Sequence, residues 1–213
     1  MSGEIKYIID GYKKFRQKYF DDSSSIFEDL KNGQNPKILV IACSDSRVDP
    51  AIILNCKPGD LFVVRNFANL VPHYENDDGH HGTSAALEFA VCDLEVKHII
   101  IFGHSSCGGI NALVTNPTKM QEKNFISRWM ELAQPAYQKT IQDFPNASIA
   151  QKVDSCSHFA LINSLKNLYT FPWISSKVEA GKLSLHSWYF NIESGTIEEF
   201  QPELGNFTDL KIS

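Results

Sequence analysis

The 213-residue chain has no apolar run long enough to span a bilayer, and no internal repeat or low-complexity segment. Its opening residues, Met-Ser-Gly-Glu-Ile-Lys, lack the apolar core and the small-residue cleavage site of a secretory signal. Basic residues do not outnumber acidic ones, and the formal net charge is −5. That balance gives no reason to expect nucleic acid as a partner. The sequence therefore predicts a globular protein with no nucleic-acid and no membrane partner.

A disulfide scaffold is also absent, because the five cysteines are an odd number without disulfide-scaffold spacing. An odd number in a chain of this length is typical of a reducing compartment, where cysteines are metal ligands or small buried residues. The composition predicts a cytoplasmic protein and is compatible with import into an organelle. Nothing in the pattern indicates more than packing for Cys56, Cys92 and Cys156.

Two cofactor signatures are also missing. No Gly-x-Gly-x-x-Gly follows a predicted strand, which argues against dinucleotide binding. The His-x-Glu with Pro-Cys-x-x-Cys signature of the zinc nucleobase deaminases is absent as well.

The middle of the chain alternates between strand and helix patterns. Continuous apolar runs at 37–43, 60–65 and 97–103 predict strands that are covered on both faces, as in a parallel sheet. Between the last two runs, residues 83–94 predict a helix whose Ala86, Phe89, Ala90 and Leu94 share one face. This alternation favours an α/β core.

The rest of the chain adds helices and a final hairpin. Residues 119–169 are largely helical in pattern, with interruptions near Pro135 and Pro145. Residues 182–192 and 196–200 flank Glu193-Ser194-Gly195 and predict a hairpin, or a last sheet strand with an extension. We therefore expect an α/β fold with a central parallel sheet of about four strands, flanked by helices and forming a single domain over residues 1–213.

Residues 1–33 predict a helical arm before the core, which spans 34–213. Ile8, Tyr12, Phe15 and Tyr19 recur at helical spacing, with lysines and an arginine on the other positions. Packing on this subunit or on a neighbouring one is one interpretation, and a membrane surface or calmodulin is another. A second helix is predicted from the serines at 23–25 to Gly33.

Two short motifs follow two of the predicted strands. Cys43 ends the first strand, and His104 and Cys107 follow the third, three residues apart between glycines that free the backbone. Thiolate and imidazole ligands are what zinc prefers, and a fourth open position marks a catalytic zinc site. The alternative is a buried Cys43, a satisfied His104 and a Cys107 packed as a small hydrophobe. If the strands are neighbours, both motifs lie at their carboxyl ends in one crevice.

Asp45 and Arg47 follow Cys43 in the motif Cys-Ser-Asp-Ser-Arg. Zinc lowers the pKa of a bound water, and Asp45 is placed to accept a hydrogen bond from that water or to bind the metal itself. Arg47 can hold a carboxylate with two parallel bonds and so keep Asp45 off the metal. The pair therefore predicts a gate, in which Asp45 either binds the metal and closes the site or is held by Arg47 and leaves it open.

With these residues the chain resembles the β-class carbonic anhydrases. The likeness is densest over residues 34–113 and rests on the Cys43 motif, on Phe-Val-Val-Arg-Asn-Phe-Ala-Asn-Leu-Val at 62–71 and on Gly-His-Ser-Ser-Cys-Gly-Gly at 103–109. The resemblance implies reversible hydration of carbon dioxide to bicarbonate through zinc-bound hydroxide, with one zinc ion per chain. It also implies a homodimer or an assembly of dimers.

The resemblance assigns roles residue by residue. Cys43, His104 and Cys107 correspond to the zinc ligands, and Asp45 with Arg47 to the catalytic gating pair. The residues that it places around the substrate are Gln34, across the dimer interface, and Phe62, Phe67, Phe89 and Gly108. Phe67 stands where relatives often carry valine, and Phe89 where plant-type relatives often carry tyrosine.

One departure from the family pattern indicates the subtype. Members with an inhibitory bicarbonate site carry tryptophan and glycine at the positions of Val40 and Ala42, so Arg65 lacks those partners here. We therefore expect the plant-like subtype, with Asp45 off the metal at neutral pH.

The sequence leaves open two alternative functions and the identity of the residue that carries the proton. Hydrolysis of carbonyl sulfide or carbon disulfide on the same scaffold and a non-catalytic zinc or thiol sensor are the rival functions. Candidates to carry the proton are His73, His80 and His81 in a polar loop, because the ordinary pKa of a histidine suits a proton shuttle near neutral pH. The alternative is that they are simply exposed loop residues.

Overall fold

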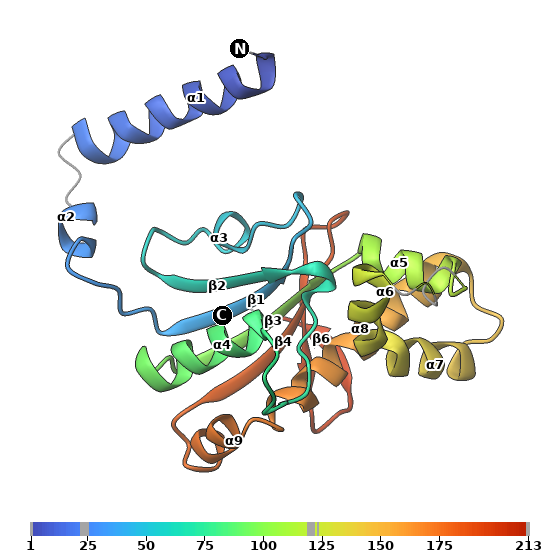
Figure 1. The fold of residues 1–213 in the computed structure, drawn as a ribbon. Coiled ribbons are helices and arrows are strands. Elements are labelled where there is room, and N and C mark those ends of the chain that lie inside the picture. Colours follow the sequence, from blue (N-terminus) through green and yellow to red (C-terminus); the bar gives the residue numbers. More distant parts are fainter. Residues whose placement is uncertain (1, 22–25, 119–121, 123, 212–213) are drawn as a thin grey trace. The chain divides into compact units, whose positions relative to one another are not determined.

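The structure is a computed structural model that describes residues 2–21, 26–118, 122 and 124–211. These residues fall into two compact units, Met1–Asn35 and Pro36–Ser213. None of the helices among them combines the length and the apolar character that crossing a membrane requires. Figure 1 shows the course of the chain in each unit.

The first unit holds two helices. Helix α1 (Gly3–Arg16) is the helix that the spacing of Ile8, Tyr12 and Phe15 predicts, and none of its residues is buried. It continues into a wider, π-type turn at Gln17–Asp21. Helix α2 (Ile26–Leu30) ends before Gly33, where the prediction had it end, and the serines at 23–25 lie outside the described residues. Aromatic rings of the two segments pack together, with Phe20 and Phe27 stacked at 5.0 Å between centroids.

The second unit is built on a six-stranded sheet in the order β2-β1-β3-β4-β5-β6. The first four strands of that order pair in parallel. Strand β5 then pairs antiparallel with β4, and β6 pairs antiparallel with β5. This confirms the predicted four-stranded parallel sheet and the hairpin, while the sixth strand was not expected. The strands are β1 (Ile38–Cys43), β2 (Leu61–Asn66), β3 (His98–His104), β4 (Ser184–Phe190), β5 (Ile197–Gln201) and β6 (Asn206–Asp209).

Helices cover the sheet because the central strands are apolar on both faces. Leu39 and Ile41 of β1 share a core with residues of α4, α8 and α9, whereas Val40 and Ala42 pack on the opposite face with Ile53 of α3. The helices of this unit are α3 (Pro50–Ile53), α4 (Gly82–Glu88), α5 (Gly108–Thr115), α6 (Phe125–Met130), α7 (Gln134–Asp143), α8 (Ile149–Leu168) and α9 (Pro172–Glu179).

One sequence expectation about a helix needs correction in detail, and the expected break near Pro135 is confirmed. The helix predicted over 83–94 exists, and Ala90 and Leu94 of its predicted face pack on the core together with Leu87 and Val91. Phe89 of that face is instead 43% exposed, where the helix widens into a π-type turn. The predicted interruption near Pro135 lies between α6, which ends at Met130, and α7, which begins at Gln134. Pro135 stands in the first turn of α7, because proline fits where no backbone N–H is needed.

Candidate metal centre

The two cysteine–histidine motifs meet at one end of the sheet because β1 and β3 are parallel neighbours. Cys43 is the last residue of β1 and His104 is the last of β3, and Cys107 precedes α5. Their ligand atoms all lie within 4.8 Å of one another. All three residues are buried, with 4% or less of their surface exposed. The structure therefore brings together the predicted ligand set.

The imidazole of His104 is oriented by its own loop. Its Nδ1 lies 2.9 Å from the carbonyl oxygen of Ser105, which can only accept, so the ring proton is on Nδ1. Nε2 is thereby left with a lone pair, and it is buried with no hydrogen-bond partner. A metal-binding histidine characteristically has this second contact, which fixes the tautomer and the direction of the lone pair.

The two thiols share a hydrogen bond. The Cys107 thiol donates to the sulfur of Cys43, and this bond lowers the pKa of Cys43. The same hydrogen bond, together with burial, raises the pKa of Cys107. A buried pair of sulfurs facing an unpaired imidazole nitrogen is the donor set that zinc prefers. The residues present therefore fit a zinc ion.

Asp45 stands beside this group and is held by Arg47. The Arg47 backbone N–H and Nε donate to Oδ1 at 3.0 and 2.9 Å, and Nη2 donates to Oδ2 at 2.7 Å. Asp45 Oδ2 lies 3.9 Å from Nε2 of His104. The guanidinium of Arg47 keeps the pKa of the Asp45 carboxyl well below its usual range. The carboxylate is therefore charged and lies next to the ligand atoms, and its Oδ2, which accepts one of these three bonds, can accept another.

Ser106 connects the two motifs. Its carbonyl oxygen accepts a hydrogen bond from Nη2 of Arg47 at 3.1 Å. Ser106 has φ 56°, a left-handed conformation that costs free energy in a residue other than glycine. This strained turn aims the serine carbonyl at the arginine, so the loop after β3 helps to orient the pair that follows β1.

The predicted substrate residues fall into separate groups. Phe62 and Phe89 pack together with their ring centroids 5.8 Å apart. Phe67 lies against Gly109, next to Gly108 at the start of α5. Gln34 is exposed and belongs to the first unit, so its predicted role stays a prediction.

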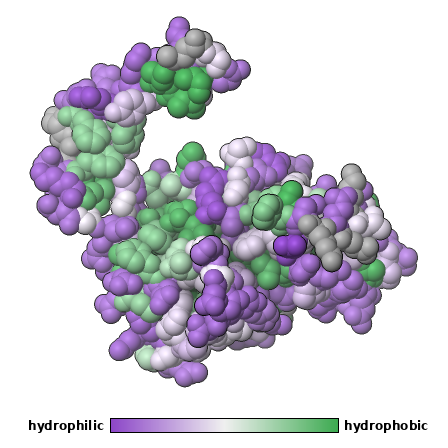
Figure 2. Space-filling view, viewed as in Figure 1, coloured by the Kyte–Doolittle hydropathy of each residue, from purple (hydrophilic) through white to green (hydrophobic). Residues whose placement is uncertain are grey.

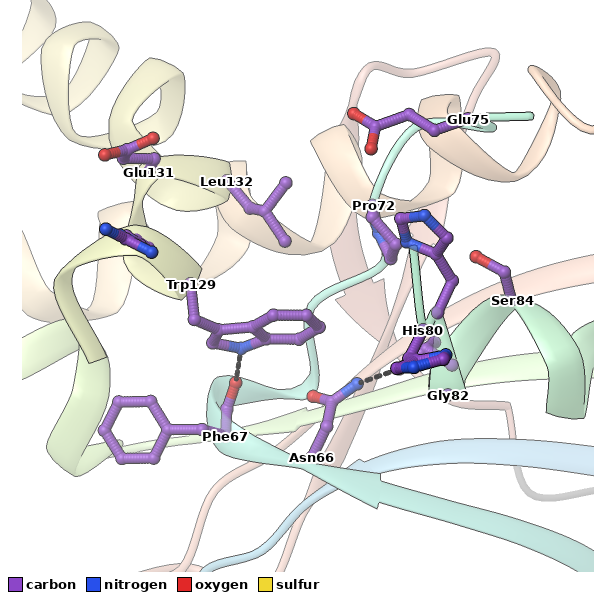
Figure 3. A pocket seen from close by; sticks show the side chains of 13 residues that line it. Asn66, Phe67, Pro72, Glu75, His80, Gly82, Ser84, Trp129, Glu131 and Leu132 are labelled. Carbon is purple, nitrogen blue, oxygen red and sulfur yellow. Dashed lines mark hydrogen bonds between the residues drawn. The ribbon is translucent and has the colours of Figure 1, made fainter. Parts of the chain in front are cut away.

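A cavity of about 650 Å³ adjoins Phe67 on the side away from its ring. Figure 3 shows the indole of Trp129 lying across this cavity, with its Nε1–H donating to the carbonyl of Phe67 at 2.6 Å. His80 and His81 line the same cavity, and a hydrogen bond with Asp77 raises the pKa of His81. Two of the three histidines considered as proton carriers therefore line the cavity beside Phe67.

Several contacts at the site could not be predicted from the sequence. The Ser105 and Ser106 carbonyls are backbone groups, which leave no trace in side-chain patterns. Trp129 comes from a distant helix and carries no motif. Arg65 has a motif position, but its contacts to the Cys43 loop were not foreseen.

Comparison with known proteins places the chain in a family. The carbonic anhydrase family matches residues 38–197. A carbonic anhydrase from Synechocystis sp. is 36% identical over 203 residues, which cover 95% of this chain and 73% of that protein. The chloroplastic β carbonic anhydrase 5 of Arabidopsis thaliana is 42% identical over 197 residues, or 92% of this chain and 64% of that protein.

Solved structures agree with the sequence comparison. The β-carbonic anhydrase CcaA matches with a TM-score of 0.92 at 33% identity, covering 99% of this chain and 94% of that one. A tetrameric β-carbonic anhydrase of Sordaria macrospora matches with a TM-score of 0.83 at 28% identity, covering 97% of this chain and 100% of that one. The chain therefore belongs to the β-carbonic anhydrase family, and it is an enzyme of the lyase class.

Proposed function

We propose that this chain catalyses the reversible hydration of carbon dioxide to bicarbonate and a proton, with one zinc ion held by Cys43, His104 and Cys107. The observation that carries the proposal is the bare, buried Nε2 of His104, which faces two sulfurs beside a charged carboxylate. Zinc bound there would supply a Lewis acid and an acidified water.

The protein's own residues then divide the remaining work. Asp45, held by Arg47, offers its charged oxygens as hydrogen-bond acceptors next to the ligand atoms, and so orients the attacking group. Arg47 keeps that carboxylate away from the ligand set, which favours the plant-like, open arrangement at neutral pH. Buried Val40 and Ala42 give Arg65 no aromatic partner for an inhibitory bicarbonate.

The substrate residues act by shape and by hydrogen bonding. The predicted pocket residues are apolar, which suits carbon dioxide because it carries no charge to recognise: Phe67 lies against Gly109, and Phe62 and Phe89 form a separate pair. The N–H of Gly108, at the first turn of α5, would donate to the developing negative oxygen. Gln34 of a second copy would donate there as well.

The proposed assembly is a homodimer or a set of dimers. Its support is the uncovered apolar stripe on α1, where Ile5, Ile8 and Tyr12 are each more than half exposed. Figure 2 also shows apolar side chains gathered on the second unit over β2 and α4, where Val63 and Phe89 are exposed. Packing against another subunit would remove both surfaces from water.

A reducing compartment such as the cytoplasm is the proposed location. Its support is that all five cysteines are free thiols, including the two proposed zinc ligands. One relative is named as chloroplastic, so an organelle is compatible with the proposal.

The deciding experiment is stopped-flow hydration of carbon dioxide at neutral and alkaline pH, with zinc per chain measured on the same samples. Fast turnover at neutral pH with one zinc per chain is the expected result. Full zinc with no turnover would refute the proposal, and a parallel rate measurement with carbonyl sulfide would then test the sulfur-substrate alternative. The Cys107→Ser variant is the matched control that should lose both zinc and turnover.

A further inference from the structure

Arg65 lies at the carboxyl end of β2, in register with Ala42 on β1. Its guanidinium donates three hydrogen bonds across the gap between the two strand ends. Nε donates to the carbonyl of Cys43 at 2.9 Å, Nη2 to the carbonyl of Asp45 at 2.6 Å, and Nη1 to Oδ2 of Asp49 at 3.2 Å. All three acceptors belong to the same seven-residue stretch of chain.

That stretch is the loop between β1 and α3. Cys43 starts it, Asp45 lies in its middle, and Asp49 ends it as the N-cap of α3. Asp49 uses its other oxygen, Oδ1, to accept from the backbone N–H of Ala51 at 3.0 Å. Arg65 therefore ties the beginning, middle and end of the loop to the neighbouring strand.

The two arginines act on opposite ends of Asp45. Arg47 holds the carboxylate and Arg65 holds the backbone carbonyl of the same residue. Apart from Arg65, that carbonyl accepts only from the N–H of Val48, at 3.2 Å, among the described residues. With its backbone and its side chain both engaged, Asp45 has one defined position next to the ligand atoms.

Arginine is specifically suited to this task. Its planar fork presents donors in fixed directions, whereas a lysine ammonium at the end of a flexible stem is a point charge that cannot reproduce that geometry. The Arg65 side chain is 29% exposed, and its partner Asp49 is 40% exposed. An ion pair this accessible contributes little to stability. The role of Arg65 is therefore to hold the loop in place through its directed hydrogen bonds rather than to stabilise the fold through its charge.

We propose that Arg65 is a positioning residue, which fixes the Asp45 carboxylate beside the proposed zinc ligands by clamping the loop from Cys43 to Asp49. The expected effect of Arg65 on turnover rests on the proposed function, whereas its expected effect on the position of Asp45 does not. Arg65 thus has a role in this protein, that of holding the loop, even though the aromatic residue with which it would form an inhibitory bicarbonate site is missing.

The kinetic test compares Arg65→Gln and Arg65→Lys with Arg128→Gln. Arg128 is an exposed arginine on α6 whose only hydrogen bond among the described residues is made by its backbone N–H, to the carbonyl of Asn124, so its variant matches the charge change alone. Both Arg65 variants should lower kcat by about ten- to a hundredfold, because a displaced catalytic group costs about that much. KM should stay within about twofold and zinc at one per chain, and Arg128→Gln should behave as the parent does.

The second readout does not use turnover. Cobalt-substituted protein reports the ligand field of the ion through its visible absorption, which should change in Arg65→Gln because the Asp45 carboxylate is no longer fixed. Arg128→Gln should give the parent spectrum. If Arg65→Gln does not fold, Arg65→Lys, which keeps the charge, is measured in its place.

The outcomes separate the two proposals. Unchanged kcat with an unchanged cobalt spectrum would overturn the positioning role, as would a loss of kcat that only parallels loss of metal. A parent protein without carbon dioxide hydration would refute the proposed function, and the cobalt spectra of the same variants would still decide whether Arg65 sets the geometry.

Discussion

The aromatic ring of Phe67 lies directly on Gly109. A Cβ atom on this glycine would come within 2.8 Å of Phe67 Cε1 and within 3.1 Å of the Cβ of Ala68. Phe67 follows β2 and Gly109 is in the first turn of α5, so this contact joins the chain after β2 to the loop that carries His104 and Cys107. The glycine is therefore required by its neighbour and not by its own backbone conformation.

Replacing Gly109 by alanine should destabilise the protein by about 1–3 kcal/mol, the usual cost of overpacking a close contact. The sign is informative, because alanine in a helix otherwise gains about 1 kcal/mol over glycine. Chemical denaturation of the zinc-loaded protein measures the change. Gly82→Ala in α4 is the matched control, since nothing lies within 4 Å of its added Cβ and it should not destabilise.

The identity of Phe67 should decide the size of that penalty. In a Phe67→Val background the ring atoms that the new Cβ meets are gone and only Ala68 remains close. Gly109→Ala should then cost at least about 1 kcal/mol less than in the parent, a coupling typical of residues in contact. Equal penalties in both backgrounds would show that the ring does not determine the need for glycine.

Asp45→Asn should slow turnover by about a hundredfold or more, as expected when a positioned acid–base group is lost. The amide presents a donor to Arg47 where the carboxylate presented only acceptors, so the three bonds to that arginine cannot all persist. Zinc content should not change, because the described contacts engage Asp45 with Arg47. A variant that loses its zinc would instead make Asp45 a structural ligand.

Chelation of zinc should lower the free energy of unfolding by about 4 kcal/mol when the starting zinc concentration is about a thousand times its Kd. The physical reason is the buried Nε2 of His104, which has no other partner. Thermal denaturation with and without chelator measures the shift in Tm. His104→Gln should make the protein insensitive to chelator, whereas Cys56→Ser, at a cysteine outside the ligand group, should leave the shift intact.

Ile8→Gln should weaken self-association if α1 buries its apolar stripe against another subunit. Each isoleucine removed from an interface costs about 1.5–3 kcal/mol, and a two-fold dimer contains the site twice. Lys6→Gln, a matched change on the other side of the helix, should leave association intact. Sedimentation equilibrium of the full chain compares the three dissociation constants, and equal values would place the interface elsewhere.

The sequence was sufficient for the parts of the fold that depend on pattern. The apolar runs of β1, β2 and β3 identify three strands, and their parallel pairing brings Cys43 and His104 to one sheet end. The expected cover on both faces is wrong for β2, which is the edge strand and leaves Val63 exposed. Phe89 was misplaced because a wider turn after Glu88 rotates it out of the predicted face. Helical periodicity assumes a regular helix, and it cannot anticipate such a change in pitch.

What the sequence could not supply is contact between side chains and distant backbone. The three acceptors of Arg65 are two carbonyls and a capping aspartate, and carbonyl groups look alike at every position. The tautomer of His104 depends in the same way on a single carbonyl in its loop. The sequence indicates which groups carry the chemistry, whereas the fold determines how each of them is held.

His158, far from the ligand motifs in sequence, should make stability fall as the solution is acidified. Its ring stacks on Phe207 with centroids 4.4 Å apart and meets Tyr189 edge-on at 4.3 Å. Nε2 is 3.3 Å from Oε2 of Glu198 but makes no hydrogen bond. Burial among these rings lowers the pKa of His158 to about 4, and the charge of Asp154 opposes that shift only in part.

The direction follows from where the proton binds. The unfolded chain has a histidine pKa of about 6.5, so between about pH 6.5 and 4 the unfolded state binds more protons than the folded state. Stability is therefore lost as the pH falls through this window, by at most about 3 kcal/mol from this residue. Glu198 acts in the opposite sense, since burial raises its pKa and the folded state takes up its proton first.

The comparison of the parent with His158→Gln isolates the histidine, because Glu198 and Asp154 are present in both proteins. Denaturation should give free energies of unfolding that depend less steeply on pH in the variant between about pH 6.5 and 4, whatever its stability at neutral pH. Parallel curves would mean that the folded protein admits a proton to His158 as readily as the unfolded chain does. The buried charge would then have to be compensated in the folded protein, and the Glu198 carboxylate, 3.3 Å from Nε2, is the group placed to do so.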